Sequence, residues 1–246
     1  MKENKYDDNI FFQKYSQMSR SQQGLAGAGE WETLRKLLPD FKDKRVLDLG
    51  CGYGWHCIYA MEHGASSVVG IDISHKMLEV AKEKTHFPQV EYKCCAIEDV
   101  EFPEESFDVI LSSLAFHYVA DYEILVKKIY RILKSGGKLV FTVEHPVFTA
   151  YGTQDWYYNE KGEILHFPVD NYYYEGKRTA VFLGEKVTKY HRTLTTYLNT
   201  LLSNGFIINH IVEPQPAENM MDIPGMQDEM RRPMMLIVSA NKKVDR

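Results

Sequence analysis

The chain has 246 residues, 44% hydrophobic and 13% aromatic, enough to bury a full core in one large domain or a domain with an insertion. Its formal net charge of -5 argues against a broad basic surface, so nucleic acid is not an expected partner. No apolar run approaches the roughly 18 residues of a membrane span and MKENKYDDNI is no signal peptide, so we expect a cytoplasmic protein without a membrane partner.

The predicted elements begin with an N-terminal helical cap, residues 1–40, whose clearest helix covers 29–38. Strand-like and helical runs then alternate from Arg45 to Glu144, which indicates a parallel sheet covered on both faces. The predicted strands cover 45–48, 67–71, 90–93, 107–112 and 138–144.

Three helices are expected between these strands, starting near Gly54, Ser74 and Asp121. Ser74 can cap the second helix, Gly64 suits a left-handed C-terminal cap, and Gly136-Gly137 is predicted to end the run ILVKKIYRIL. Residues 146–190 interrupt the alternation as an aromatic-rich β insertion after the fifth strand. A helix, a turn at Gly205, a strand and a final strand in PMMLIVSA should follow.

The four cysteines lack paired metal or disulfide spacing, so we expect small buried thiols at Cys51, Cys57, Cys94 and Cys95.

The stretch VLDLGCGYG sets three glycines at alternate positions between a strand and a helix. Glycine lets a ligand approach the main chain, and the helix start offers unpaired N–H donors, although tight turns also use glycine for packing. Asp72 ends the next strand, 20 positions after Gly52, where a carboxylate can accept from both ribose hydroxyls. Together these features predict a nucleoside-type ligand.

Asp48 separates this turn from the G-x-G-x-x-G turn of dehydrogenases, because an acid there suits a ligand ammonium and repels a pyrophosphate. A nicotinamide-dependent oxidoreductase is therefore disfavoured. The alternative for Asp48 is a solvated acid at a strand end.

Four motifs, VLDLGCGYG, VVGIDIS, AIEDVEFPEESFDVILSSLAFHYV and LKSGGKLVFTVEHP, resemble in order and spacing those of class I S-adenosylmethionine-dependent methyltransferases. The resemblance is strong over residues 37–145. It implies an α/β fold with a doubly wound, mostly parallel seven-stranded sheet of order 3-2-1-4-5-7-6, the last strand antiparallel. It also implies one methyltransferase domain over 1–246, with S-adenosyl-L-methionine as cofactor and S-adenosyl-L-homocysteine as product.

The resemblance also implies contacts for individual residues. Asp48, Gly50 and Gly52 would hold the methionine part of the cofactor, and Asp72 the ribose. The remaining implied contacts are to the adenine and the methionine end: Ile73 and Met77 flanking the adenine, Ile97 and Glu98 at its edge, and Ser112, Ser113 and Leu114 beside the methionine. Ala96 departs from the family pattern, in which an Asp commonly accepts from the adenine amino group.

The segment FFQKYSQMSRSQQGLAGAGEW is similar to the leading helices that close over the cofactor in small-molecule members. Tyr15 would cover the cofactor and Arg20 would pair with its carboxylate. A core tyrosine and a surface arginine are the alternative.

Methyl transfer from a sulfonium needs mainly exclusion of water and alignment of the acceptor at roughly 3–3.5 Å, so no metal is implied. If the acceptor must lose a proton, His145 after the fifth strand is the first candidate base, followed by His191, with Arg192 gripping an acidic substrate. Each histidine could instead be structural, which is the expectation for His117.

The aromatic residues of 146–190 suit a substrate lid, or alternatively packing on the core or on a second subunit of a monomer or homodimer. They are Phe148, Tyr151, Trp156, Tyr157, Tyr158, Phe167, Tyr172, Tyr173, Tyr174, Phe182 and Tyr190. We expect a small-molecule acceptor, with methylation on oxygen, nitrogen or carbon left open. An RNA-modifying enzyme or a non-catalytic S-adenosylmethionine-binding protein are the alternatives.

Overall fold

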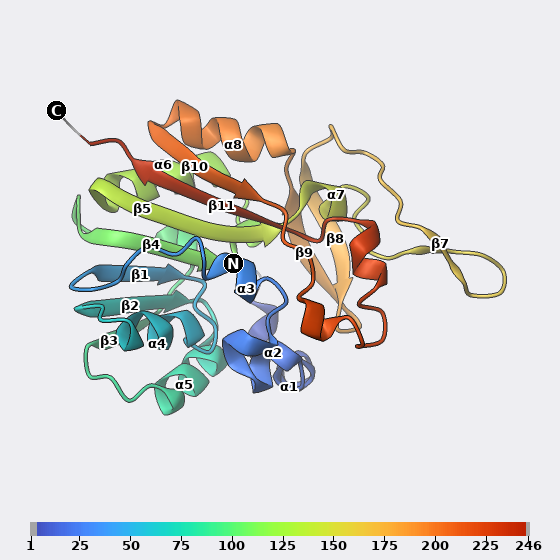
Figure 1. Ribbon diagram of the computed structural model, residues 1–246, viewed down its shortest axis with the longest axis horizontal. Helices are drawn as coiled ribbons and strands as arrows, with labels where there is room; N and C mark the ends of the chain where they lie inside the picture. Colours follow the sequence, from blue (N-terminus) through green and yellow to red (C-terminus); the bar gives the residue numbers. More distant parts are fainter. Residues whose placement is uncertain (1–3, 245–246) are drawn as a thin grey trace.

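The computed structural model describes residues 4–244, which form a central sheet with helices on both faces and a β insertion at one end (Figure 1). The seven-stranded sheet has the order β10-β11-β5-β4-β1-β2-β3. Strands β1 to β5 pair in parallel, and β11 runs antiparallel to β5 and β10. The predicted order and the antiparallel last strand are confirmed. The strands are β1 (Arg45–Leu49), β2 (Ser67–Asp72), β3 (Val90–Cys94), β4 (Phe107–Ser113), β5 (Leu133–Glu144), β10 (Phe206–Val212) and β11 (Met235–Lys242).

Two apolar layers hold the sheet between its helices, because successive strand residues point to opposite faces. Leu47 and Leu49 of β1 pack with α6 (Tyr122–Ile132) and α8 (Leu194–Ser203). Val46 packs on the other face with residues of α3 (Trp31–Leu34), α4 (Trp55–Glu62) and α5 (His75–Lys84). The central strands are thus buried on both sides.

Local capping explains where the long helices begin. The Ser74 hydroxyl accepts from the Met77 N–H at the start of α5, and Asp121 accepts from Ile124 at the start of α6. Gly64, with φ +87°, follows the end of α4 as predicted.

Two predicted helix boundaries are wrong. The helix expected over 29–38 is reduced to α3, which covers Trp31–Leu34 and is followed by turns. The run before Gly136-Gly137 ends earlier, because α6 stops at Ile132 and β5 begins at once. The two glycines lie inside β5, where its pairing with β4 jumps from Leu133 to Lys138. The two glycines accommodate this shift in strand pairing, and they do not end the helix.

The N-terminal segment and the insertion lie beside the carboxyl ends of the parallel strands (Figure 1). The N-terminal segment contains short helices, and the insertion contains α7 and two β hairpins. Their bounds are η1 (Lys5–Asp7), α1 (Asn9–Ser16), α2 (Ser19–Gln22), η2 (Gly24–Gly27), α7 (Pro146–Thr149), β6 (Tyr157–Tyr158), β7 (Ile164–His166), β8 (Gly176–Phe182) and β9 (Glu185–His191). Further 3-10 turns are η3 (Ile97–Asp99), η4 (Phe116–Tyr118), η5 (Glu218–Met220) and η6 (Asp228–Arg231).

The cysteine prediction holds for two of the four thiols. Cys51 and Cys57 are buried, whereas Cys94 is exposed and Cys95 is half-buried. Cys94 ends β3, the edge strand of the sheet, so one side of it has no neighbouring strand to cover it.

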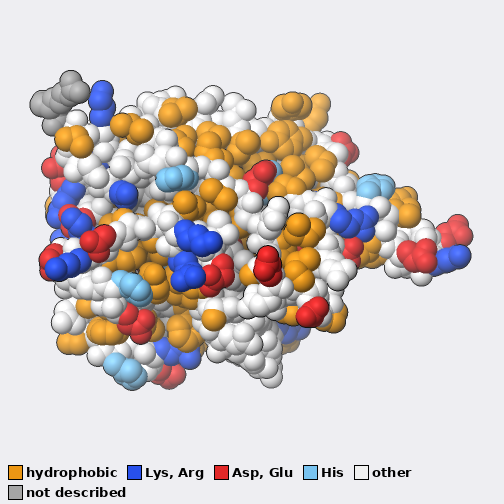
Figure 2. Space-filling view, viewed as in Figure 1, with side chains coloured by type: hydrophobic (Ala, Val, Ile, Leu, Met, Phe, Trp, Pro, Cys, Tyr) orange, Lys and Arg blue, Asp and Glu red, His pale blue; other side chains and the backbone are white. Residues whose placement is uncertain are grey.

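The surface drawn in Figure 2 carries acidic and basic side chains side by side, without one broad basic area on that face. Among residues 4–244, no helix is both long enough and apolar enough to cross a bilayer.

Candidate functional site

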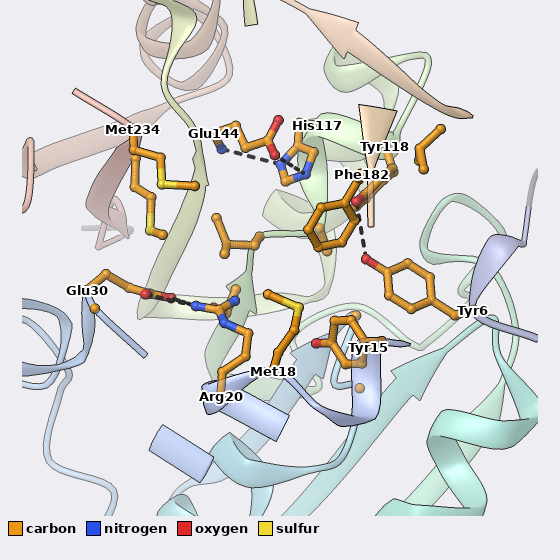
Figure 3. Close-up of a pocket in the computed structure, with 18 of the residues that line it drawn as sticks. Tyr6, Tyr15, Met18, Arg20, Glu30, His117, Tyr118, Glu144, Phe182 and Met234 are labelled. Carbon is orange, nitrogen blue, oxygen red and sulfur yellow. Dashed lines mark hydrogen bonds and ion pairs between the residues drawn. The ribbon is translucent and has the colours of Figure 1, made fainter. Parts of the chain in front are cut away.

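A cavity of about 1110 Å³ opens at the carboxyl ends of β1, β2, β4 and β5, the edge where open α/β sheets bind ligands. Residues from the N-terminal helices, the insertion and the segment before β11 complete its walls (Figure 3). Pockets for one drug-sized ligand hold roughly 300–1,000 Å³. This cavity therefore has room for two small ligands side by side.

The glycines of the first turn serve different purposes. Gly50 has φ +79°, and a Cβ there would lie 2.4 Å from the Ala115 Cβ, so the protein itself excludes a side chain. Gly52 has φ +53°, but a Cβ there would meet nothing within 4 Å. Both line the cavity. Gly52 is thus the position at which the main chain is open to a ligand.

Asp72 lies at the end of β2 with its carboxylate on the cavity wall. Oδ2 accepts from the Gly52 N–H at 2.9 Å, and Oδ1 accepts from the Ser74 N–H at 2.8 Å. Burial raises the pKa of this carboxyl to about 6, against which these hydrogen bonds act. Each oxygen keeps a lone pair for a further donor, such as a hydroxyl.

Asp48 does not line the cavity, so of the two expected ways of reaching a ligand ammonium, directly or through water, the direct one is not supported. Asp48 is 1% exposed, Cys57 Sγ lies 3.5 Å from its Oδ2, and Oδ1 is buried without a partner among the described residues. Burial raises its pKa to about 7. Asp48 could therefore act on a ligand only by positioning the glycine turn that follows it or through a bridging water.

The raised pKa of Asp48 predicts a pH-dependent stability difference. Above an unfolded-state pKa near 3.8 the folded protein holds this proton more tightly, so its stabilising contribution is lost as pH rises toward 7. We expect Asp48→Asn to gain stability relative to the wild type between about pH 4 and 7, by up to about 1.4 kcal/mol per pH unit, and to gain nothing further above pH 7. Urea unfolding at several pH values measures this difference. Buried histidines are present in both proteins, so their titration cancels in the comparison. A stability difference between variant and wild type that does not change with pH would contradict the raised pKa of Asp48.

Most of the other predicted cofactor residues line the cavity, namely Ile73, Met77, Ile97, Glu98, Ser113, Tyr15 and Arg20. Ser112 does not, because its hydroxyl is turned away and donates to the Leu49 carbonyl at 2.7 Å. Arg20 already forms an ion pair with Glu30, with Nη2 2.6 Å from Oε1. A ligand carboxylate would therefore have to share this guanidinium.

Hydrogen bonds to Asp7 hold the N-terminal segment beside Asp72. Asp7 Oδ1 accepts from the Ser74 hydroxyl at 2.6 Å and from the Lys76 N–H at 3.1 Å, at the start of α5. These hydrogen bonds lower the pKa of Asp7 although burial opposes them. The segment is thus held as a cover over one end of the cavity.

The three predicted catalytic residues lie outside the cavity lining, and this placement does not support a role for them at the acceptor. His145 caps α7 by accepting from Val147, and its Nε2 lies 3.0 Å from Glu213. Both His191 ring nitrogens are engaged, by the Thr149 hydroxyl and the Tyr172 carbonyl. Arg192 donates to the carbonyls of 119 and 120.

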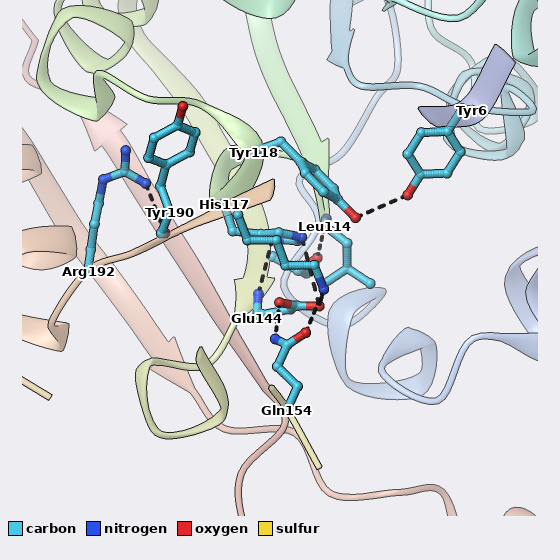
Figure 4. A network of polar contacts seen from close by, with 10 residues as sticks. Tyr6, Leu114, His117, Tyr118, Glu144, Gln154, Tyr190 and Arg192 are labelled. Atoms are coloured by element: carbon cyan, nitrogen blue, oxygen red, sulfur yellow. Dashed lines mark hydrogen bonds and ion pairs between the residues drawn. The ribbon is translucent and has the colours of Figure 1, made fainter. Parts of the chain in front are cut away.

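His117 and Glu144 line the cavity instead, in a buried polar cluster that the sequence analysis did not assign (Figure 4). The Glu144 N–H donates to His117 Nδ1 at 3.4 Å, and the Glu144 carboxylate accepts from Lys189 and Gln154. Burial lowers the pKa of His117 to about 4. The available signal was the position of Glu144, at the same sheet edge as Asp72.

Comparison with known proteins decides the family. A model described as "Methyltransferase domain" matches residues 47–141. A candidate S-adenosylmethionine-dependent methyltransferase from Listeria monocytogenes is 59% identical, with a TM-score of 0.86 over 89% of this chain and 99% of that one. An S-adenosylmethionine-dependent methyltransferase from Mesorhizobium loti is 41% identical, with a TM-score of 0.82 over 89% and 100%. A Haemophilus influenzae protein is 35% identical, covering 96% of both chains.

This chain is a class I S-adenosylmethionine-dependent methyltransferase. S-adenosylmethionine is its cofactor, and the cavity of the methyltransferase fits it. Asp72 offers a carboxylate for a ribose diol, Gly52 leaves the main chain open, and Met77 and Ile97 provide apolar surface for a base. Bound S-adenosylmethionine supplies an electrophilic methyl group on a sulfonium.

The remaining residues of the methyltransferase position this chemistry. Leu114, just after β4, has φ +52°, a conformation rare for a branched residue. Its N–H donates to both the carbonyl and the hydroxyl of Thr142, each at 3.0 Å. A backbone held in this way at the cavity wall is suited to orienting a ligand within it.

Proposed function

We propose that the methyltransferase acts on a small-molecule acceptor, which fills the half of the cavity beside Glu144. The observation that carries this proposal is the wall of that half, where Tyr118, Phe182 and Met234 surround the polar cluster (Figure 3). An apolar pocket with a few convergent polar groups is typical of small-molecule sites.

The insertion supports the proposal as a substrate lid, because Trp156, Phe182 and Tyr190 line the cavity. Its other aromatic residues have different surroundings. Phe148 and Phe167 stack with ring centroids 5.7 Å apart, and Tyr173 is 87% exposed. The insertion would therefore combine lid and packing functions, the two alternatives that its composition leaves open.

Transfer in such a site needs no metal ligand from the protein. The chain's contribution would be to exclude water and hold the acceptor in line with the methyl group, which contributes most when the acceptor is already a neutral nucleophile. His117 Nδ1 is occupied by the Glu144 N–H, so this nitrogen is not available as a base.

Methyl-labelled S-adenosylmethionine tests the proposal, incubated with the protein and either an ultrafiltered bacterial metabolite extract or total RNA. We expect label in a small-molecule product and release of S-adenosylhomocysteine. Label confined to RNA would contradict the proposal and favour an RNA-modifying enzyme. Binding of S-adenosylhomocysteine without turnover of either pool would favour a non-catalytic binding protein.

A further inference from the structure

The acceptor half of the cavity contains a buried ion pair. Glu144 and Lys189 side chains are 12% and 3% exposed, and Lys189 Nζ contacts Glu144 Oε1. Gln154 bridges the two, donating to Glu144 Oε2 and accepting from Lys189 at 2.8 Å. The carboxylate and the ammonium compensate each other, so this end of the cavity carries no net charge.

His117 adds a neutral donor to the same end. Because Nδ1 accepts from the Glu144 N–H, the ring proton of the neutral imidazole lies on Nε2. Nε2 is 4.0 Å from Glu144 Oε1, too far for a good hydrogen bond. Its N–H is therefore available to a ligand oxygen or nitrogen.

Most of the charged residues around the cavity are already paired with a residue of opposite charge, so few could bind an ionic acceptor. Arg20 is paired with Glu30, Lys5 lies 3.9 Å from Glu185, and Asp228 is paired with Arg231. Among the described residues, the buried cations that line or adjoin the cavity each have an anionic or carbonyl partner. Lys177 also lines the cavity, but it is exposed to solvent. A phosphate or carboxylate beside Glu144 would thus find no unpaired buried cation among the described residues.

A cationic acceptor is disfavoured for the opposite reason. The Lys189 ammonium lies 5.9 Å from the Tyr118 ring centroid and 5.4 Å from that of Phe182. The aromatic faces that would receive a cationic ligand already face a resident cation. A second cation would find the Glu144 carboxylate already paired with Lys189.

From this arrangement we propose that the acceptor is an uncharged molecule with an aromatic or other flat apolar body. It donates one hydrogen bond to the Glu144 carboxylate and accepts one from His117 Nε2–H. Glu144 retains lone pairs for this donor, since each oxygen accepts one hydrogen bond within the protein. The inference rests on the proposed function and specifies its substrate class.

Three matched probes test the charge preference: tyrosol, 4-hydroxyphenylacetate and tyramine share a phenol and differ in an uncharged, anionic or cationic end. Calorimetry on the protein saturated with S-adenosylhomocysteine measures their affinities. We expect tyrosol to bind at least about tenfold more tightly than either charged probe. Equal affinities, a tighter charged probe, or no binding of any probe would overturn the inference.

A charge-changing variant gives a second readout. Lys189→Met leaves Glu144 uncompensated, so tyramine should gain at least about tenfold relative to the wild type. Lys186→Met is the matched control, because Lys186 lies exposed on the same strand and should change nothing. Retained binding of S-adenosylhomocysteine shows that each variant is folded; if Lys189→Met is not, the wild-type preference decides. These assays read binding alone, so they fail independently of the labelling test for methyl transfer.

Discussion

Replacing Asp72 by alanine is expected to weaken the binding of S-adenosylhomocysteine by about 100-fold or more. The carboxylate on the cavity wall would accept from both ribose hydroxyls, and hydrogen bonds to a charged group contribute about 1.5–3 kcal/mol each. Two such bonds at the lower value give about 3 kcal/mol, which corresponds to about two orders of magnitude in affinity. Calorimetry at pH 8, where the wild-type carboxyl with a pKa of about 6 is ionised, measures the loss.

The control is Glu91→Ala, which removes an exposed acid from β3, the strand next to β2. Its affinity should equal that of the wild type. Lowering the pH through 6 should also weaken the wild-type protein, by protonating Asp72, but have less effect on Asp72→Ala. An alanine variant with wild-type affinity would remove Asp72 from the cofactor site.

Replacing Glu144 by alanine is expected to lower the free energy of unfolding by about 3–5 kcal/mol, because it leaves the Lys189 ammonium buried without its partner. Burial opposes ionisation of Glu144, yet the neighbouring His117 and Lys189, together with hydrogen bonds from Lys189 and Gln154, hold its pKa below the usual value. The Glu144 carboxyl is therefore ionised at neutral pH. Denaturant unfolding monitored by circular dichroism measures the change.

The double variant Glu144→Ala with Lys189→Met should recover most of this loss, since a buried ion pair can be replaced by apolar groups at little cost. Glu185→Ala is the matched control on the same hairpin. Glu185 is only partly buried, with cations 3.9–4.0 Å away, and such pairs contribute about 0–1 kcal/mol. A Glu144→Ala variant as stable as Glu185→Ala would show that the cluster is solvated.

The core strands were predictable because each is a short apolar run with its own turn signals. Ser74 and Asp72 were likewise predictable, since a cap and a strand end depend on neighbours a few residues away. The helix over 29–38 was not, because its apolar residues pack as a short turn on α4 instead of continuing. The sequence also failed to predict that Gly136 lies inside a strand, because β5 begins directly after α6 without a glycine turn between them.

The choice between His145 and His117 shows where local reasoning fails. Both histidines lie near the same sheet edge, but only His117 lines the cavity, together with Glu144. The side chain of His145, the residue after Glu144, caps α7 instead. The strand β5 ends at Glu144, and His145 already belongs to the turn into α7, so its side chain is directed by the helix cap and not by the strand. A one-residue difference thus moved the assigned chemistry from the cavity to a helix cap.

By itself the sequence determined where the parallel strands lie, the glycine turn and the acid that ends β2, because these depend on short-range periodicity and on motifs contiguous in the chain. The order of the strands in the sheet followed from the family resemblance. Only the tertiary structure decided which polar groups share the acceptor half of the cavity. Glu144, His117 and Lys189 come from β5, the turn after β4 and the insertion, so their mutual pairing is a long-range contact. An ion pair between segments so distant in the chain produces no periodic pattern in the sequence, so it could not be predicted from the sequence.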